Sequence, residues 1–181
     1  MTLQEIRAIA KQHHINYDGL SKTTLLRKIH RQNKNHWQEG VAAYKRGDYL
    51  EALAKLKPLA SKDDVDAQVF IGFMYERGQG VQQDYRQALA WYLKAAEQGD
   101  VQMQSKLGVI YGNGRGIPQD FVQAHKWYSL AELAGNEDAR ENRKMAERMM
   151  SHEQIEKAQK LAGTWLAKHK RHAQPAALQS E

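Results

Sequence analysis

The sequence predicts an all-α protein, a right-handed α-solenoid of helix-pair repeats preceded by a small helix-loop-helix module. Two observations carry this prediction: a pattern of residues occurs twice between Asp66 and Asn136, and helix-starting residue pairs recur at equivalent positions. The composition agrees, since 41% of the 181 residues are apolar and only three are proline. A fixed internal period indicates stacked helical units, each of which buries its apolar side against its neighbours.

The repeated pattern combines tyrosine, glycines, aspartate, alanine and a Trp-Tyr pair. Every matching residue lies 36 positions after its counterpart. The pairs are Gly72 and Gly108, Tyr75 and Tyr111, Gly78 and Gly114, Gly80 and Gly116, Asp84 and Asp120, Ala88 and Ala124, Trp91 and Trp127, and Gly99 and Gly135. We therefore predict two full repeats, at 66–100 and 101–136, and a shorter related repeat at 36–65.

Several classes of protein are disfavoured by what the sequence lacks. Without cysteine there is no disulfide framework and no thiolate metal site. No apolar run approaches the roughly 20 residues of a membrane span, and the first residues do not resemble a signal peptide. We therefore expect a cytoplasmic protein that does not associate with membranes.

Motifs for catalysis, cofactors or metals are also missing. Glycines 112, 114 and 116 do not form a dinucleotide-binding or phosphate-binding loop, and the eight histidines contain no H-E-x-x-H pattern. There is no G-x-S-x-G sequence for a serine nucleophile. We therefore expect no catalytic residues, no cofactor and no metal site.

Positive charge is concentrated in the first 36 residues, which hold seven Lys and Arg against two acidic residues. Within residues 1–34, Thr2 and Glu5 form a capping box that begins a helix running to about His13. An extended link follows, and Ser21 is placed to cap a second helix. Asn33 to Asn35 read as a linker to the repeats.

This first segment resembles the helix-loop-helix modules of the SAP type and of the N-terminal domain of the transcription terminator Rho. The matching features are a first helix that is apolar and basic, a loop that ends in Leu20-Ser21-Lys22, and the helix that contains Leu25-Leu26-Arg27-Lys28-Ile29. The resemblance implies phosphate contacts with DNA or RNA by Lys22, Arg27, Lys28 and Arg31. Alternatively, the segment is a polar cap that closes the repeat array.

Each repeat is expected to be two antiparallel helices. Capping boxes at Asp48 and Glu51, Asp84 and Gln87, and Asp120 and Gln123 predict where the second helices begin. Gly99 and Gly135 are placed to end them. Gly72 and Gly108 lie inside first helices, which favours close helix packing there, and Pro58 should end or kink its helix.

The two full repeats resemble the Sel-one-like repeat, a relative of the tetratricopeptide repeat. The shared pattern is Leu-Gly-x-x-Tyr-x-x-Gly-x-Gly-Val, an aspartate, and Ala-x-x-Trp-Tyr-x-x-Ala-Ala. Ile71, Ile117 and Glu132 are small departures from it. The resemblance implies an adaptor or scaffold that binds a protein or peptide on its concave face.

Candidate residues for that face are first-helix positions outside the stacking stripe. They are Phe70, Phe73, Met74, Lys106, Val109 and Ile110. The alternative is that Phe73, Met74, Val109 and Ile110 are buried against neighbouring helices. Exposed aromatic and methionine side chains would favour peptide binding.

The C-terminal part predicts a closing helix pair over 137–168. Asn136 can cap its first helix, and Ser151 with Gln154 forms a capping box for the second. Residues 169–181 have little periodicity and are expected to be a flexible tail. Two functions remain: a protein-interaction scaffold, and a nucleic-acid-associated adaptor tethered by residues 1–34.

Overall fold

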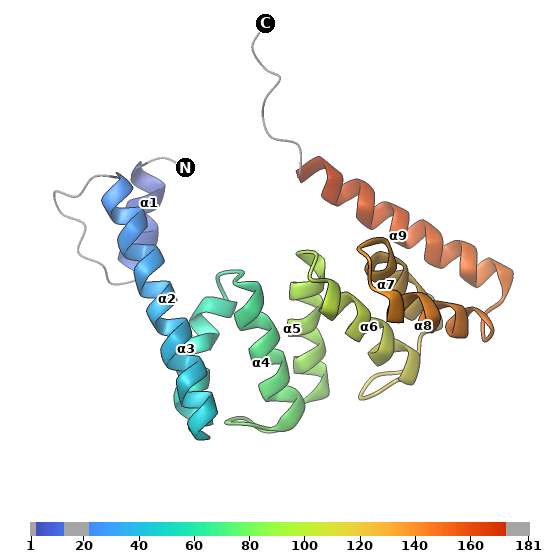
Figure 1. Cartoon of the computed structure of the whole chain (residues 1–181), viewed down its shortest axis with the longest axis horizontal. Helices are drawn as coiled ribbons and strands as arrows, with labels where there is room; N and C mark the ends of the chain where they lie inside the picture. Colours follow the sequence, from blue (N-terminus) through green and yellow to red (C-terminus); the bar gives the residue numbers. More distant parts are fainter. Residues whose placement is uncertain (1–2, 13–21, 173–181) are drawn as a thin grey trace, which may run out of the picture. The chain divides into compact units, whose positions relative to one another are not determined.

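The computed structural model describes residues 3–12 and 22–172, and these contain nine α-helices and no strand. The helices are α1 (Leu3–Gln12), α2 (Lys22–Arg46), α3 (Tyr49–Ala60), α4 (Val65–Arg77), α5 (Tyr85–Glu97), α6 (Val101–Asn113), α7 (Phe121–Leu133), α8 (Glu137–Glu147) and α9 (His152–His172). Figure 1 shows these helices with their labels, coloured in the order of the sequence. The predicted class, an all-α helical repeat solenoid, is confirmed.

The helices form two compact units, one ending at Gln83 and the other beginning at Asp84. The first unit holds α1 to α4, and the second holds α5 to α9. None of the described helices is both long and apolar enough to cross a membrane.

Short polar residues start the repeat helices at regular intervals. Asp64, Asp100 and Asn136, which are 36 residues apart, cap α4, α6 and α8 through a side-chain oxygen that accepts a backbone N–H three residues on. This shared cap and spacing identify α8 as the first helix of a further pair. Asp48, Asp84 and Asp120 do the same for α3, α5 and α7, as the sequence predicts.

Only part of the predicted capping boxes forms. The N–H of Asp48 donates to the carbonyl of Ala43, and the N–H of Asp120 donates to that of Tyr111. These backbone donors are therefore already satisfied, and neither needs the side chain three residues later. A complete box forms at Ser151 and Gln154, where each side chain accepts the other residue's N–H.

The predicted linker at Asn33 to Asn35 is wrong, because α2 runs without a break from Lys22 to Arg46. Its N-terminal part packs on α1 through Ile6, Ala10 and Ile29, all of them buried. Its C-terminal part is the first helix of the first repeat. One helix therefore packs against α1 with its first part and against α3 with its last part. It is unbroken because none of the residues across the predicted linker breaks a helix.

An aromatic cluster joins α2 to α4 in the first unit. Phe70 lies edge-on to Trp37 and Tyr44, with ring centroids 5.3 and 5.5 Å away. The hydroxyl of Tyr44 donates to Oε1 of Gln79 in the loop after α4, at 2.8 Å. These contacts hold the start of the first full repeat against the shorter one.

Pro58 does not stop α3, which continues to Ala60. Only Leu59 and Ala60 follow the proline in this helix. The chain then turns at Ser61, whose N–H donates to the carbonyl of Lys57. The predicted ends of α5 and α7 are confirmed, since Gly99 and Gly135 follow them with φ of 93°.

The predicted tail begins too early, because α9 extends through His172. Trp165 donates from Nε1 to the Glu97 carboxylate at 2.8 Å, and the ring of His169 stacks on Trp165 with centroids 3.7 Å apart. Nε2 of His169 lies 2.7 Å from the carbonyl oxygen of Glu97. These contacts fix the end of α9 on α5, whereas residues 173–181 lie outside the described part.

Candidate partner-binding groove

An open groove of about 570 Å³ lies in the second unit, between α6 and α8 and over α7. We call it the α6–α8 groove. Its walls are Val109, Gly112 and Asn113 from α6, and Asn142, Met145, Ala146, Arg148 and Met149 from α8 and the turn after it. Gln119, Phe121 and Tyr128 come from α7 and the loop before it.

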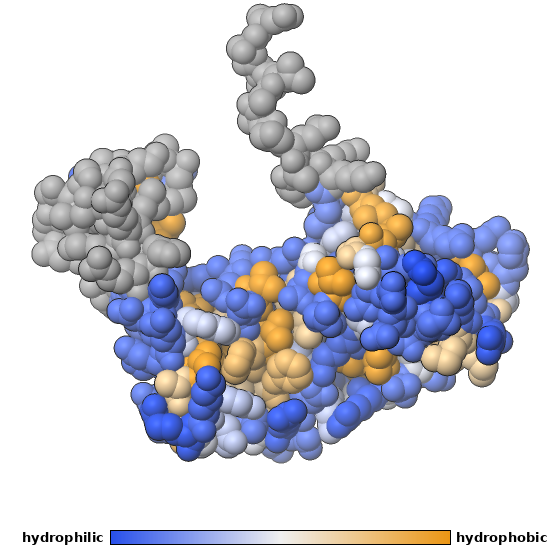
Figure 2. Space-filling model, in the orientation of Figure 1, coloured by the Kyte–Doolittle hydropathy of each residue, from blue (hydrophilic) through white to orange (hydrophobic). Residues whose placement is uncertain are grey.

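Apolar side chains are unusually exposed along this groove. Val109 is 40% exposed, Met145 55% and Met149 67%, although all three are large and apolar. Figure 2 shows small hydrophobic areas among hydrophilic side chains where α6 and α8 lie. Exposed apolar side chains beside a hollow are characteristic of binding surfaces. Methionine adapts its shape to different partners because its chain is unbranched and flexible.

The base of the groove is fixed by Tyr128 on α7. Its ring is buried, and burial raises the pKa of its hydroxyl to about 12. The hydroxyl, which is protonated at neutral pH even at the ordinary tyrosine pKa of about 10, can donate a hydrogen bond. Gln119 donates to the carbonyl of Gly112, which ties the α6–α7 loop to the last turn of α6.

A network of ion pairs holds α8 on α7. Glu132 accepts from Arg140 and Arg143 at 3.1 and 2.7 Å, and Arg143 also pairs with Glu147. Nε2 of the buried His125 lies 2.9 Å from the Glu147 carboxylate. These charges are therefore engaged with each other and fix the position of the wall that α8 provides.

Of the six residues predicted to bind a partner, Val109 lines the groove. Ile110 and Lys106 are half-buried and lie outside its lining, and Nζ of Lys106 is 4.8 Å from the ring centroid of Tyr92. Sequence spacing distinguished exposed from packed positions on α6 only in part. The reason is that α6 contacts helices on several sides.

The other three predicted residues lie on α4 in the first unit. Met74 is wrong as a surface residue, because it is completely buried. It corresponds to Ala146, 72 positions later, which is also buried. Phe70 belongs to the aromatic cluster, and Phe73 is half-buried. Figure 2 shows hydrophobic side chains gathered over α4.

Sequence reasoning missed two of the main wall residues, Asn142 and Met145. They lie 36 residues after Lys106 and Val109, which were predicted for the same face. Extending the repeat period beyond Asn136 would have found them. The signal was weaker there because the glycine pattern of the two full repeats does not continue into the closing pair.

The predicted nucleic-acid contacts fall outside what can be described in atomic detail. Lys22, Arg27, Lys28 and Arg31 belong to α2, but their side chains are outside the described part of the structure. The predicted caps at Thr2 and Ser21 also lie outside the described residues. Of this module, the structure describes α1 and its contact with α2.

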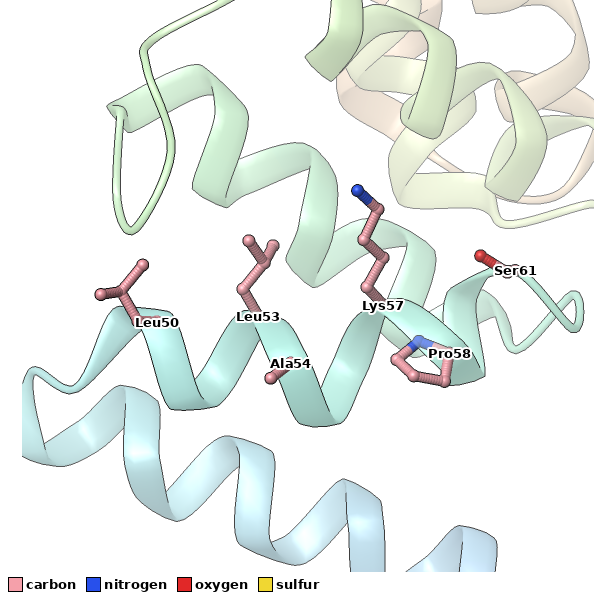
Figure 3. A pocket seen from close by; sticks show the side chains of 6 residues that line it. All are labelled: Leu50, Leu53, Ala54, Lys57, Pro58 and Ser61. Atoms are coloured by element: carbon pink, nitrogen blue, oxygen red, sulfur yellow. The ribbon is translucent and has the colours of Figure 1, made fainter. Parts of the chain in front are cut away.

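A second hollow, of about 370 Å³, lies on α3 (Figure 3). Its lining comes from α3 and the residue that follows it: Leu50, Leu53, Ala54, Lys57, Pro58 and Ser61. Leu50 is 71% exposed, while Ala52 and Leu56 on the other side of α3 are buried. Helix α3 is therefore apolar on two sides, a feature that its sequence pattern did not predict.

Two segments of the chain match a known protein family, and each segment covers one pair of helices. The Sel1 repeat matches residues 65–100, which cover α4 and α5, and residues 101–136, which cover α6 and α7. Residues 65–136 therefore match two consecutive Sel1 repeats. Sel1 repeats generally mediate protein–protein interaction. The groove thus lies between α6, the first helix of the second matching segment, and α8.

Two solved structures resemble the chain. One is c5321, a protective antigen present in uropathogenic Escherichia coli strains and displaying an SLR fold, with 24% identity over 99% of this chain and a TM-score of 0.67. The other is a Sel1 repeat protein from Oxalobacter formigenes, with 36% identity over 59% of this chain and a TM-score of 0.54. The match spans 45% and 44% of those chains, respectively. Among curated proteins the comparison found no match.

Proposed function

We propose that this protein is a non-catalytic interaction scaffold that binds a segment of a partner protein in the α6–α8 groove. The observation that carries the proposal is the exposure of Val109, Met145 and Met149 beside an open hollow. Burying such side chains removes apolar surface from water, which contributes about 25 cal/mol for each Å². Two Sel1 repeats in the same chain support this function.

The test is photocrosslinking from defined positions in the full chain. A photoreactive phenylalanine analogue replaces Met145 in one variant and Leu133 in the other. Leu133 is the matched control because it is also a large exposed side chain, at 69%, but does not line the groove. We expect a discrete protein to be crosslinked in the native host from position 145 and not from position 133.

Either of two results would contradict this function. One is that position 145 gives no crosslinked protein. The other is that positions 145 and 133 give the same products, which would indicate random collision rather than a site. Circular dichroism of both variants verifies that each is folded before the comparison is made.

A second candidate function is nucleic-acid association through residues 1–34. The observation that favours it is positive charge, since the first 36 residues contain seven Lys and Arg but only two acidic residues. Binding to phosphates should weaken steeply as salt rises. The test measures the affinity of the full chain for labelled single-stranded and double-stranded DNA and RNA at increasing salt.

Neutralising Lys22, Lys28 and Arg31 together should abolish that binding and flatten its salt dependence. The matched control neutralises Lys157, Lys160 and Lys168 on α9, which removes the same charge elsewhere. Equal loss in both variants would show that only net charge matters, and this function would then be rejected.

A further inference from the structure

Gly112 in the wall of the α6–α8 groove is a helical glycine that helix packing does not require. A Cβ added there would lie 3.7 Å from Cβ of Ala124 and 3.8 Å from the hydroxyl of Tyr128, which are ordinary contact distances. Its φ is not positive, so the backbone does not require glycine either. Glycine inside a helix costs about 0.5 to 1 kcal/mol relative to alanine.

The preceding repeat shows that a side chain fits at this position. Glu76 lies 36 residues before Gly112, at the same place in α4. The same hydrogen bond forms at both positions. The side-chain amide of Gln83 donates to the carbonyl of Glu76, and that of Gln119 donates to the carbonyl of Gly112. Compared with α4, the missing side chain at Gly112 is therefore particular to α6.

The polar groups of the groove define what else can bind. Arg148 is the only charged residue among those that line it. Its charge also acts on Glu141, whose pKa is lowered first by a hydrogen bond from Lys144 and only weakly by Arg148. A carboxylate in the groove would thus meet a cation and no lining acid.

Two residues with amide side chains line the groove, Asn113 on α6 and Asn142 on α8. Within the described residues, neither side chain makes a hydrogen bond. An amide side chain can donate and accept, so it matches the N–H and C=O groups of a peptide backbone. A helical ligand would already have satisfied those groups itself, which favours a peptide bound in an extended form.

We infer that the groove binds an extended peptide that carries a bulky apolar side chain and an acidic residue. The apolar side chain packs against Gly112, between Val109 and Met145, and the carboxylate pairs with Arg148. Gly112 is then the residue that determines which side chains fit. This inference rests on the proposed function, because it names the partner chemistry of the same groove.

The test begins by selecting binders of the full chain from a phage-displayed library of short random peptides. The most enriched peptide is synthesised with a fluorescent label, both as selected and with each acidic residue replaced by its amide. Fluorescence anisotropy then gives the affinity of both peptides for the wild type and for Gly112→Glu, Arg148→Gln and Met145→Ser.

We expect selected peptides to combine Leu, Met or Phe with Asp or Glu. Gly112→Glu should weaken binding by about tenfold or more, because its side chain fills the hollow and repels the carboxylate. Arg148→Gln should weaken the acidic peptide about two- to fivefold, as expected for a partly exposed ion pair, and leave the amide peptide unchanged. If Gly112→Glu proves unfolded, Arg148→Gln with the two peptides decides.

The outcomes separate the two proposals. If Met145→Ser weakens binding but either Gly112→Glu in folded form or Arg148→Gln has no effect, this inference is overturned and the scaffold function stands. Enrichment of basic or wholly polar peptides that still depend on Met145 would likewise overturn the inference and leave the scaffold function in place. If no peptide is selected, or none of the three substitutions alters binding, the groove is not a peptide site and both proposals fail.

Discussion

The ring of Tyr128 fills the space beside Gly108, so that a Cβ on Gly108 would lie 2.3 Å from the ring's Cε1 atom. Tyr128 is buried, and the nearest atoms belong to its ring rather than to the free end of a flexible chain. The close approach of α6 and α7 thus depends on the missing side chain. The same tyrosine lines the α6–α8 groove, so this packing also sets the groove's base.

Replacing Gly108 by alanine should lower the stability of the second unit by about 1 to 3 kcal/mol, because the added methyl group overlaps the Tyr128 ring. Urea unfolding followed by circular dichroism measures the change. Gly163→Ala is the matched control, since Gly163 also lies in a helix but a Cβ there meets nothing within 4 Å. An unchanged or raised stability in Gly108→Ala would show that the tyrosine moves freely.

Replacing Gly112 by alanine should have the opposite effect on stability. The methyl group meets only ordinary contacts, so the helix should gain about 0.5 to 1 kcal/mol. The same urea titration measures this gain. A loss of more than about 1 kcal/mol would contradict the claim that packing does not require glycine at this position.

Replacing Phe70 by alanine should destabilise the first unit by about 2 to 3 kcal/mol, because its ring packs edge-on against Trp37 and Tyr44. Thermal and urea unfolding measure the effect. Leu50→Ala removes a side chain that is 71% exposed and should change stability by no more than about 0.5 kcal/mol. If both substitutions changed stability equally, Phe70 would contribute no more to the fold than an exposed side chain.

Acid should weaken the contact between α7 and α8 through Glu132. A hydrogen bond from Arg143, with further help from Arg140, holds the pKa of Glu132 below its ordinary value of 4.5. Because the folded pKa is the lower one, the ionised pair adds stability above the unfolded pKa. That contribution is lost as the pH falls through the folded pKa.

The stability difference between wild type and Glu132→Gln should therefore be constant near neutral pH and shrink below about pH 4.5. Its size should be no more than about 1 kcal/mol, because the pair is only partly buried. Urea unfolding across this pH range measures it. A difference that grows as the pH falls would contradict the assigned sign.

The helices of the repeats could be placed from sequence because their signals are local. Asp84 and Asp120 cap the helices that follow them, and Gly99 and Gly135 end those helices with positive φ, as predicted. Such signals act within a few residues, so neighbours along the chain suffice to interpret them. Errors arose where no local breaker existed, as across Asn33 to Asn35 in α2 and at His169 in α9.

The candidate site was predicted less completely. Val109 lines the α6–α8 groove, whereas Met74 is buried and Met145 was not recognised as part of the same surface. The difference between Met74 and Val109 depends on which neighbouring helices cover each position. That covering is a tertiary property, because α6 contacts α5, α7 and α8, whereas α4 packs on α3 and, through Phe70, on α2.

The 36-residue period by itself determined the all-α repeat fold, because cap residues and apolar spacing act locally and recur in each unit. Tertiary structure alone decided that the ring of Tyr128 occupies the space beside Gly108, whereas Gly112 lines an open groove. Both are glycines in the same helix. The repeat separates them, since Gly108 follows Gly72 by 36 positions and Gly112 follows Glu76, but it does not say which side chain lies beside each. Their difference comes from which side chain of a neighbouring helix reaches each position.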